Sequence, residues 1–223
     1  FISFIILMGN QSFSQDIHFS QFNESPLLLN PAYTGMFEGD YRFNLNYKNQ
    51  WATVGNVYET YAASADFVLF KNYMGLKSTG MGISFFQDVA GSSRTKTSRI
   101  DLNISQTVYL SDNTDLSLGV QFAYMEMSAN YLGLSWGNQY NGVEYNGSLA
   151  SGETATGYSS KNFDLSAGLL FRAFDRNMYP LEIGLSVYHL TQPKINVLLI
   201  EETVPIRLSA SIIKEFNIES AND

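Results

Sequence analysis

Residues 41–51, YRFNLNYKNQW, alternate apolar and polar side chains along their length. The apolar set is Tyr41, Phe43, Leu45 and Tyr47, and the polar set is Arg42, Asn44, Asn46 and Lys48. Because successive side chains of a strand point to opposite faces, this period of two predicts a strand between two different solvents. The pattern recurs in runs about as long as the roughly 9–11 residues with which a tilted strand crosses a bilayer. We therefore predict an all-β protein, an antiparallel transmembrane β-barrel of an outer membrane.

The composition of the 223-residue chain also favours a membrane barrel over a soluble globule. Hydrophobic residues make up 45% of the chain and aromatic residues 14%, whereas charged residues make up only 15%, against roughly 25% in average globular proteins. No run reaches the about 18 apolar residues that a membrane-spanning helix needs. The chain has no cysteine, which excludes disulfides and thiolate metal sites. Its net charge of −8, with few and scattered cations, argues against a nucleic-acid partner.

Eight segments show the alternating pattern and are predicted to be strands that pair as consecutive antiparallel neighbours. They are residues 41–51, 58–70, 80–88, 97–110, 115–126, 162–174, 179–190 and 204–216. One face of each strand carries apolar residues for the lipid, as Leu118, Val120 and Phe122 do. The lumen-facing side carries small and polar residues, among them Gly82, Gly119, Gly168 and Gly184. A soluble sandwich also alternates, but here aromatic residues gather near strand ends, as in the girdles of outer-membrane barrels.

The lengths of the connections predict which end of the barrel faces the cell exterior. Barrels of this type have short periplasmic turns and longer extracellular loops. Segments 111–114 and 175–178 are short and turn-like, whereas 127–161, on the opposite side, is far longer. We therefore predict that 127–161 is extracellular. Segments 52–57, 89–96 and 191–203 are then also extracellular, and 71–79 and 217–223 are periplasmic.

The ends of the chain predict its divisions. Residues 1–14 combine an apolar run with small residues before Gln15, which predicts the remnant of a signal peptide; a buried N-terminal strand is the alternative. Residues 15–40 are predicted to be an N-terminal periplasmic segment, and residues 41–223 the outer-membrane β-barrel. Because the sequence starts without a methionine and stops in a polar turn, we expect a fragment whose C-terminal barrel strands are missing.

Three motifs carry a resemblance to a known family. They read Ser20-Gln21-Phe22 with Asn30-Pro31-Ala32-Tyr33-Thr34-Gly35, then Gly82-Ile-Ser-Phe-Phe-Gln-Asp88 with Gly91, and finally Gly184-Leu-Ser-Val-Tyr-His189-Leu-Thr-Gln192-Pro193. In this order they resemble the S-Q-aromatic plus N-P-A-Y-x-G, G-x-S-F-x-N-D-x-x-G and G-L-S-x-x-H-L-x-Q-P segments of the PorP/SprF family of Bacteroidetes outer-membrane proteins. Gln87 stands where the family usually has Asn.

The resemblance implies a non-enzymatic component of the type IX secretion system, or of the related gliding-motility apparatus, in the bacterial outer membrane. Such a component supports the export or surface anchoring of a secreted protein such as an adhesin. The resemblance implies three kinds of partner: membrane lipid, the periplasmic ring and lipoprotein components of the machinery, and a cognate secreted or surface protein. It implies no cofactor.

The motif residues also have simpler interpretations. Pro31 and Gly35 fit a turn leading into the first strand as well as they fit a contact with a partner or a plug. His189 is predicted to be a hydrogen-bonded residue near a strand end, and Pro193 to stop that strand. The only other histidine, His18, is far away in the sequence, so we expect no metal site.

Two other classes of function stay open at this point. Barrel architecture alone fits a diffusion channel or a hydrophobic-substrate transporter, because fold does not settle function. An outer-membrane phospholipase would need a Ser–His pair within hydrogen-bonding reach, and Ser186, near His189 in sequence, is predicted to lie on the other face of the strand. With two histidines, no cysteine and no G-x-S-x-G element, we expect no enzyme.

The long loop 127–161 supplies the candidate partner-binding residues. They are Trp136, Tyr140, Tyr145 and Tyr158, interleaved with Asn, Gly and Ser. Tyr and Trp give large contact area at low entropic cost, and the small polar residues adapt their hydrogen bonding, which is typical of protein-binding surfaces. The alternative is a loop that folds over the barrel mouth and packs on itself.

Overall fold

The computed structural model describes residues 26–50, 58–73, 75–131, 134–152, 157–175, 179–197 and 200–214. Its helical turns are α1 (Pro26–Leu29), η2 (Pro31–Tyr33) and η3 (Gly137–Gln139). Its strands are β1 (Tyr41–Gln50), β2 (Tyr58–Tyr73), β3 (Leu76–Ala90), β4 (Thr95–Ser111), β5 (Thr114–Asn130), β6 (Gly157–Phe174), β7 (Pro180–Tyr188), β8 (Lys194–Val197), β9 (Ile200–Thr203) and β10 (Arg207–Lys214). The described chain is therefore mostly strand, as the alternation predicts.

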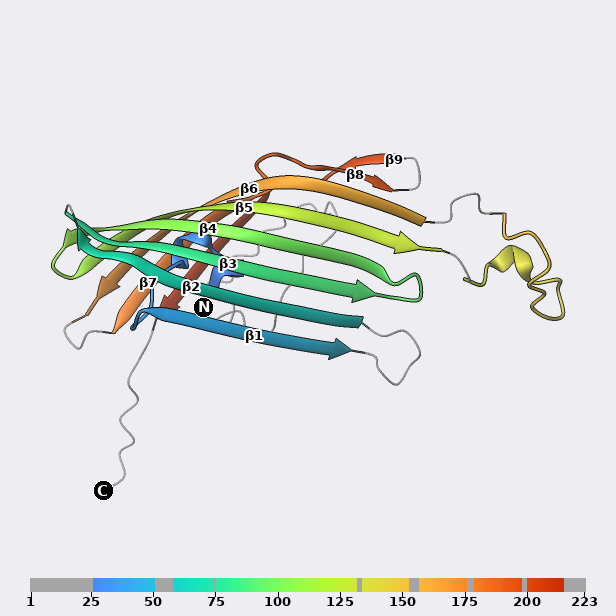
Figure 1. The fold of residues 1–223 in the computed structure, drawn as a ribbon, viewed down its shortest axis with the longest axis horizontal. Coiled ribbons are helices and arrows are strands. Elements are labelled where there is room, and N and C mark those ends of the chain that lie inside the picture. The colour runs from blue at the N-terminus through green and yellow to red at the C-terminus, as the bar shows by residue number, and fades with distance from the viewer. Residues whose placement is uncertain are drawn as a thin grey trace, which may run out of the picture.

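One antiparallel sheet of eight strands dominates the fold. Its order is β1-β2-β3-β4-β5-β6-β7-β10, so that every strand pairs with its neighbours in sequence except where the β8–β9 hairpin intervenes. Figure 1 shows the sheet curled along its width, with α1 and η2 lying within the curl. Among the described residues the sheet is unclosed, and β1 and β10 form its two edges. The predicted meander of neighbouring strands is confirmed.

The two faces of the sheet invert the burial pattern of a soluble protein. Outward-facing Leu118 and Phe122 are 59% and 53% exposed, whereas inward-facing Gln121 between them is 1% exposed. The same inversion holds on the other strands, where polar residues are buried on the inner face: Asp66, Ser84, Asp101, Asn103, Ser105, Thr107, Ser117, Asp164, Ser166 and Ser186. Apolar outer positions and a polar inner face are the arrangement of a barrel that faces lipid. A sandwich would bury the apolar face instead.

None of the helices in the described ranges is long and apolar enough to cross a membrane.

The connections divide as their lengths predict. The β4–β5 turn at residues 112–113 lies at the end of the sheet where β2 and β6 end and where β3 and β7 begin. The β3–β4 turn, the long β5–β6 loop and the β8–β9 hairpin lie toward the other end (Figure 1). The chain therefore has a short-turn end and a long-loop end.

Several predicted strands are too short: β3 begins at Leu76 rather than at residue 80, β5 runs to Asn130 rather than to 126, and β6 begins at Gly157 rather than at 162, so that Tyr158 lies on β6 and not in the loop.

Two further differences have identifiable causes. Residues 191–203, predicted to be a plain loop, contain the β8–β9 hairpin, in which Lys194 pairs with Thr203 and Val197 with Ile200. Strands of four residues are too short to show a period of two convincingly, which is why the pattern missed them. The seventh strand, predicted to run to residue 190, ends at Tyr188 because His189 turns to a φ of +61°.

Candidate functional site

The N-P-A-Y-T-G motif lies inside the curl of the sheet. It spans residues 30–35 and lies across the strands with α1, as the blue segment in Figure 1. Its members are almost inaccessible: Asn30 and Thr34 are 1% exposed and Ala32 is 0% exposed. We predicted a periplasmic segment for residues 15–40; residues 26–36 contact the inner face of the sheet, and the periplasmic assignment stays a prediction. Of the two uses considered for the motif, the structure favours the plug contact.

Local chemistry explains why the motif turns as it does. Asn30 precedes η2 as its N-cap, and its Oδ1 accepts a hydrogen bond from the Ala32 N–H at 2.8 Å. Pro31 occupies the first helical position, where its fixed φ and missing N–H cost nothing. Gly35 ends the turn with a φ of +68°, which a side chain would disfavour. Burial and the nearby Glu182 carboxylate raise the pKa of the Tyr33 phenol, so that this ring stays neutral.

A row of glycine and serine residues crosses the sheet beneath the motif. We call it the glycine–serine trough: Gly80, Ser105, Gly119, Gly168 and Ser186, one each from β3 to β7 and neighbours in register. A Cβ at Gly119 would lie 2.3 Å from the Pro31 carbonyl carbon, and one at Gly168 would lie 1.9 Å from the Asn30 Oδ1. Only glycine lets the two backbones approach so closely.

The inner face binds the main chain of the segment rather than its side chains. Six side chains from four strands donate to its carbonyl oxygens. They are Gln121 to Leu27 at 3.5 Å, Tyr188 to Leu28 at 3.0 Å, Ser186 to Leu29 at 3.2 Å, Ser117 to Ala32 at 2.8 Å, Arg42 to Tyr33 at 3.0 Å and Ser105 to Thr34 at 2.5 Å. Buried carbonyls need such donors because water cannot reach them. The polar residues of the inner face therefore serve the segment.

Asn30 makes the one contact that depends strongly on a side chain of the segment. Its Nδ2 donates to the carbonyls of Leu169 and Leu185, at 3.0 and 3.1 Å, on the adjacent strands β6 and β7. With the bond that Oδ1 accepts from Ala32, the amide is paired at both ends. A residue without this amide would lose all three bonds.

A buried ion pair holds the other end of the motif. Arg42 donates to both carboxylate oxygens of Asp66, at 3.0 and 2.8 Å, and Asp66 accepts a further bond from the Gly35 N–H at 2.8 Å. The Asp66 side chain is 0% exposed and that of Arg42 is 20% exposed. Arg42 also lies 4.8 Å from the centre of the Phe37 ring. A two-point contact of this kind fixes orientation as well as charge.

Other inward-facing charges are also paired across strands. Arg99 contacts Asp101 at 2.5 Å and Gln121 at 2.7 Å. Asp115 accepts from Lys77 and from Arg172, the latter at 3.1 Å. These pairs neutralise charges that would be costly to bury alone. They do not form a cluster of free acids and bases suited to chemistry.

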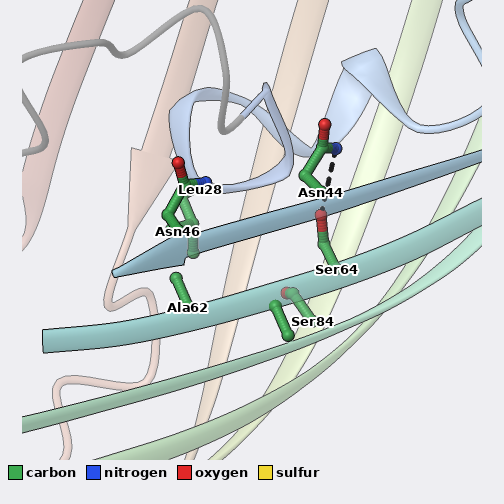
Figure 2. Close-up of a pocket in the computed structure, with 7 residues that line it drawn as sticks. Leu28, Asn44, Asn46, Ala62, Ser64 and Ser84 are labelled. Carbon is green, nitrogen blue, oxygen red and sulfur yellow. Dashed lines mark hydrogen bonds between the residues drawn. The ribbon is translucent and has the colours of Figure 1, made fainter. Parts of the chain in front are cut away.

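One hollow beside the segment, lined by described residues, is small. Figure 2 shows a hollow between Leu28 of α1 and the inner faces of β1 to β3, where Asn44 donates to Ser64 at 3.2 Å. Its volume is about 10 Å³, room for roughly one water molecule. This hollow cannot hold a solute.

The H-L-x-Q-P motif forms a constrained turn at the long-loop end. His189 and Gln192 have φ values of +61° and +47°, which are unfavourable for side-chain-bearing residues. Asp164 of β6 holds the turn, because its carboxylate contacts His189 Nδ1 at 2.7 Å and accepts from the Thr191 hydroxyl at 2.9 Å. Pro193 is buried beyond the turn. Asp164 and His189 are 25 residues apart, so no local pattern in the sequence pairs them.

The second motif has two separate roles. Asp88 accepts a hydrogen bond from Thr60 at 2.6 Å, which links β3 to its register partner on β2. Gly91 lies in the β3–β4 turn with a φ of +70°, and its carbonyl accepts from the Arg94 N–H at 3.1 Å. The motif residues Ser20, Gln21 and Phe22 lie outside the described residues.

The β5–β6 loop extends past the strand ends as a self-packed unit (Figure 1). At its base, the Tyr131 ring lies 6.2 Å from Trp136 and 6.3 Å from Tyr158. At its tip, Tyr140 and Tyr145 form an antiparallel bridge and are 56% and 53% exposed. The four candidate residues therefore divide into two at the base and two at the tip. The loop packs on itself, as the alternative proposed, but it stands away from the sheet.

The described ranges contain no group of three or more His, Cys, Asp or Glu residues placed to hold a metal ion.

Comparisons with known proteins give the family. A family model described as "Type IX secretion system membrane protein PorP/SprF" matches residues 11–218. No curated protein and no solved structure matches the chain. The match covers all three motifs, and the apolar outer face of the sheet is that of an outer-membrane barrel. The chain therefore belongs to the PorP/SprF family, membrane proteins of the type IX secretion system, in the bacterial outer membrane.

Proposed function

We propose that this secretion-system protein is a non-enzymatic scaffold that supports the export or surface anchoring of a secreted protein, such as an adhesin, through its β5–β6 loop. The observation that carries the proposal is the tip of that loop. Tyr140, Val143 and Tyr145 are 56%, 85% and 53% exposed on a unit that projects beyond the strand ends. Exposed aromatic and aliphatic side chains on a preformed support favour a protein partner.

Hydrogen bonds within the loop support this role, because they fix the tip. Gln139, which is 8% exposed, accepts from the Trp136 N–H at 3.0 Å and donates to the Leu149 carbonyl at 3.2 Å. Asn141 Oδ1 accepts from the backbone N–H groups of Val143 and Glu144 at 2.9 and 2.8 Å. A tip ordered in this way loses little conformational entropy when a partner binds. Such an arrangement suits docking better than passive coverage of the barrel mouth.

The filled inner face favours a scaffold over a diffusion channel or a hydrophobic-substrate transporter. A channel needs an open polar lumen, and residues 26–36 occupy the middle of the inner face here. A phospholipase is disfavoured because the Ser186 hydroxyl donates to the Leu29 carbonyl while His189 Nδ1 faces Asp164. We propose that the short-turn end faces the periplasmic ring and lipoprotein components of the machinery. We further propose that the protein reaches the outer membrane of a Bacteroidetes cell by means of an N-terminal signal peptide. Gliding motility is then one use of the anchored protein.

The test removes the exposed tip and leaves the base of the loop intact. In a strain that expresses the Tyr140→Ala/Val143→Ser variant, surface display of the secreted partner should fall at least tenfold, while the level of the barrel in the outer membrane stays unchanged. The matched control is Asp112→Ala, an exposed change in the short β4–β5 turn at the opposite end. Normal display from the tip variant would reject the docking role. Trp136→Ala should instead disturb the loop itself, because its ring packs on Tyr131.

A further inference from the structure

The eight strands of the sheet pair with one another without any contribution from residues 26–36. The contacts between the segment and the sheet that are described above are hydrogen bonds between a side chain and the main chain, or packing contacts. None of them is the backbone-to-backbone pairing of a strand. From this we infer that the glycine–serine trough is a peptide-binding site. Its ligand class is a short peptide with an Asn-Pro-Ala core, and the chain carries its own copy as residues 26–36. This inference does not rest on the proposed secretion role.

Recognition in the trough has two parts. The six donors described above fix the path of the ligand main chain without contacting its side chains. Leu28 and Leu29 are half-buried, and Leu29 packs against the cluster around Leu170. Selectivity rests on Asn30 and Ala32. Asn30 bonds the carbonyls of two strands, and Ala32 is 0% exposed, with its N–H and carbonyl both bonded. A larger side chain at position 32 would meet a closed surface.

The link between ligand and wall is short and accessible. Glu38, Gly39 and Asp40 are exposed and connect the buried motif to β1. Lys71 holds this linker through the Gly39 carbonyl and the Asp40 carboxylate, at 2.9 and 2.8 Å. A short tether gives its ligand an effective concentration of roughly millimolar. The site is therefore always filled in the intact chain, and its affinity becomes visible only when the tether is cut.

The experiment starts from the folded full-length chain. A protease recognition sequence is inserted between Glu38 and Gly39, the protein is folded in detergent or vesicles, and the linker is then cut. We expect the N-terminal fragment to co-migrate with the barrel on size exclusion. It should then exchange for a fluorescent synthetic peptide of residues 26–36, added in excess. A gel-shift assay of heat modifiability confirms that the barrel stays folded throughout.

Competition with unlabelled peptides measures specificity. The peptide of native sequence should displace the label, whereas the Asn30→Ala peptide should need on the order of a hundredfold more, since it lacks three hydrogen bonds worth about fivefold each. Equal competition by the two peptides would overturn the inference. So would a cut fragment that never exchanges from a folded barrel, which would make it a fixed part of the core. Unfolding of the barrel upon cleavage would likewise reject a separable ligand.

Discussion

A single methyl group at position 168 should disrupt the contact between the N-terminal segment and the sheet. In the Gly168→Ala variant, the new Cβ would lie 1.9 Å from the Asn30 Oδ1, 2.9 Å from the Asn30 Cγ and 3.0 Å from the Pro31 Cδ. Asn30 and Pro31 are buried and the Asn30 Oδ1 accepts a hydrogen bond from Ala32, so these atoms cannot move aside freely. Overpacking of this kind costs about 1–3 kcal/mol. Displacement of the Asn30 amide should break one of its three hydrogen bonds, which adds about 1 kcal/mol. We expect a total loss of about 2–4 kcal/mol.

The assay is urea unfolding in lipid vesicles, followed by tryptophan fluorescence. Gly137→Ala is the matched control, because a Cβ there meets no atom within 4 Å; its stability should stay within about 0.5 kcal/mol of the native value. The decisive variant is Asn30→Ala/Gly168→Ala. Asn30→Ala removes the two nearest atoms and leaves only the Pro31 Cδ at 3.0 Å, so adding Gly168→Ala to Asn30→Ala should cost much less than Gly168→Ala costs in the native chain. Additive losses within about 0.5 kcal/mol would refute the proposed contact.

Three further predictions concern the membrane face, the buried ion pair and the strained turn. Val120→Arg, on the outer face, should cost about 2–4 kcal/mol in vesicle unfolding. Gln121→Arg, on the inner face, should also destabilise, because Gln121 is 1% exposed and bonds Arg99; a neutral result would mean that the inner face is open there. Arg42→Ala should cost about 3–5 kcal/mol, because it leaves the Asp66 carboxylate buried and unpaired, and a loss under about 1 kcal/mol would contradict the geometry. Gln192→Val should cost about 1–2 kcal/mol at its φ of +47°, whereas Gln192→Gly should cost less, and thermal melts of the two variants compare them.

The sequence predicts the sheet well because its signal is local. The alternation along residues 41–51 can be recognised from neighbouring positions alone. Every second side chain of a membrane-spanning strand faces lipid, and this holds regardless of the contacts made by the rest of the chain. The four glycines on the inner faces of β3, β5, β6 and β7 were also placed correctly. The residues at which strands begin and end were predicted less well. The end of β7, for example, is set by the backbone turn at His189 rather than by composition.

The site could be predicted only in part because its contacts are remote in sequence. Asn30 and Pro31 indicate a turn from their own chemistry, but nothing local shows that Leu28 will accept a bond from Tyr188. Donors such as Ser105 and Ser117 look like ordinary lumen-facing residues until the ligand main chain is in place. Gly119 and Gly168 were the available signal, because repeated glycine on one face indicates close approach of another backbone.

The same remoteness sets an order of events when the chain folds. The Asn30 and Leu28 contacts join positions 139 to 160 residues apart, so they cannot form until β6 and β7 have paired. Loop-closure entropy makes such contacts late steps in folding. The residues at the start of the described chain are thus among the last to form their native contacts. In a pulse-labelling hydrogen-exchange experiment, the amides of Ala32 and Gly35 should gain protection after those of β4 and β5. An assembly factor that holds the N-terminal segment during that interval would protect the chain at its most vulnerable stage.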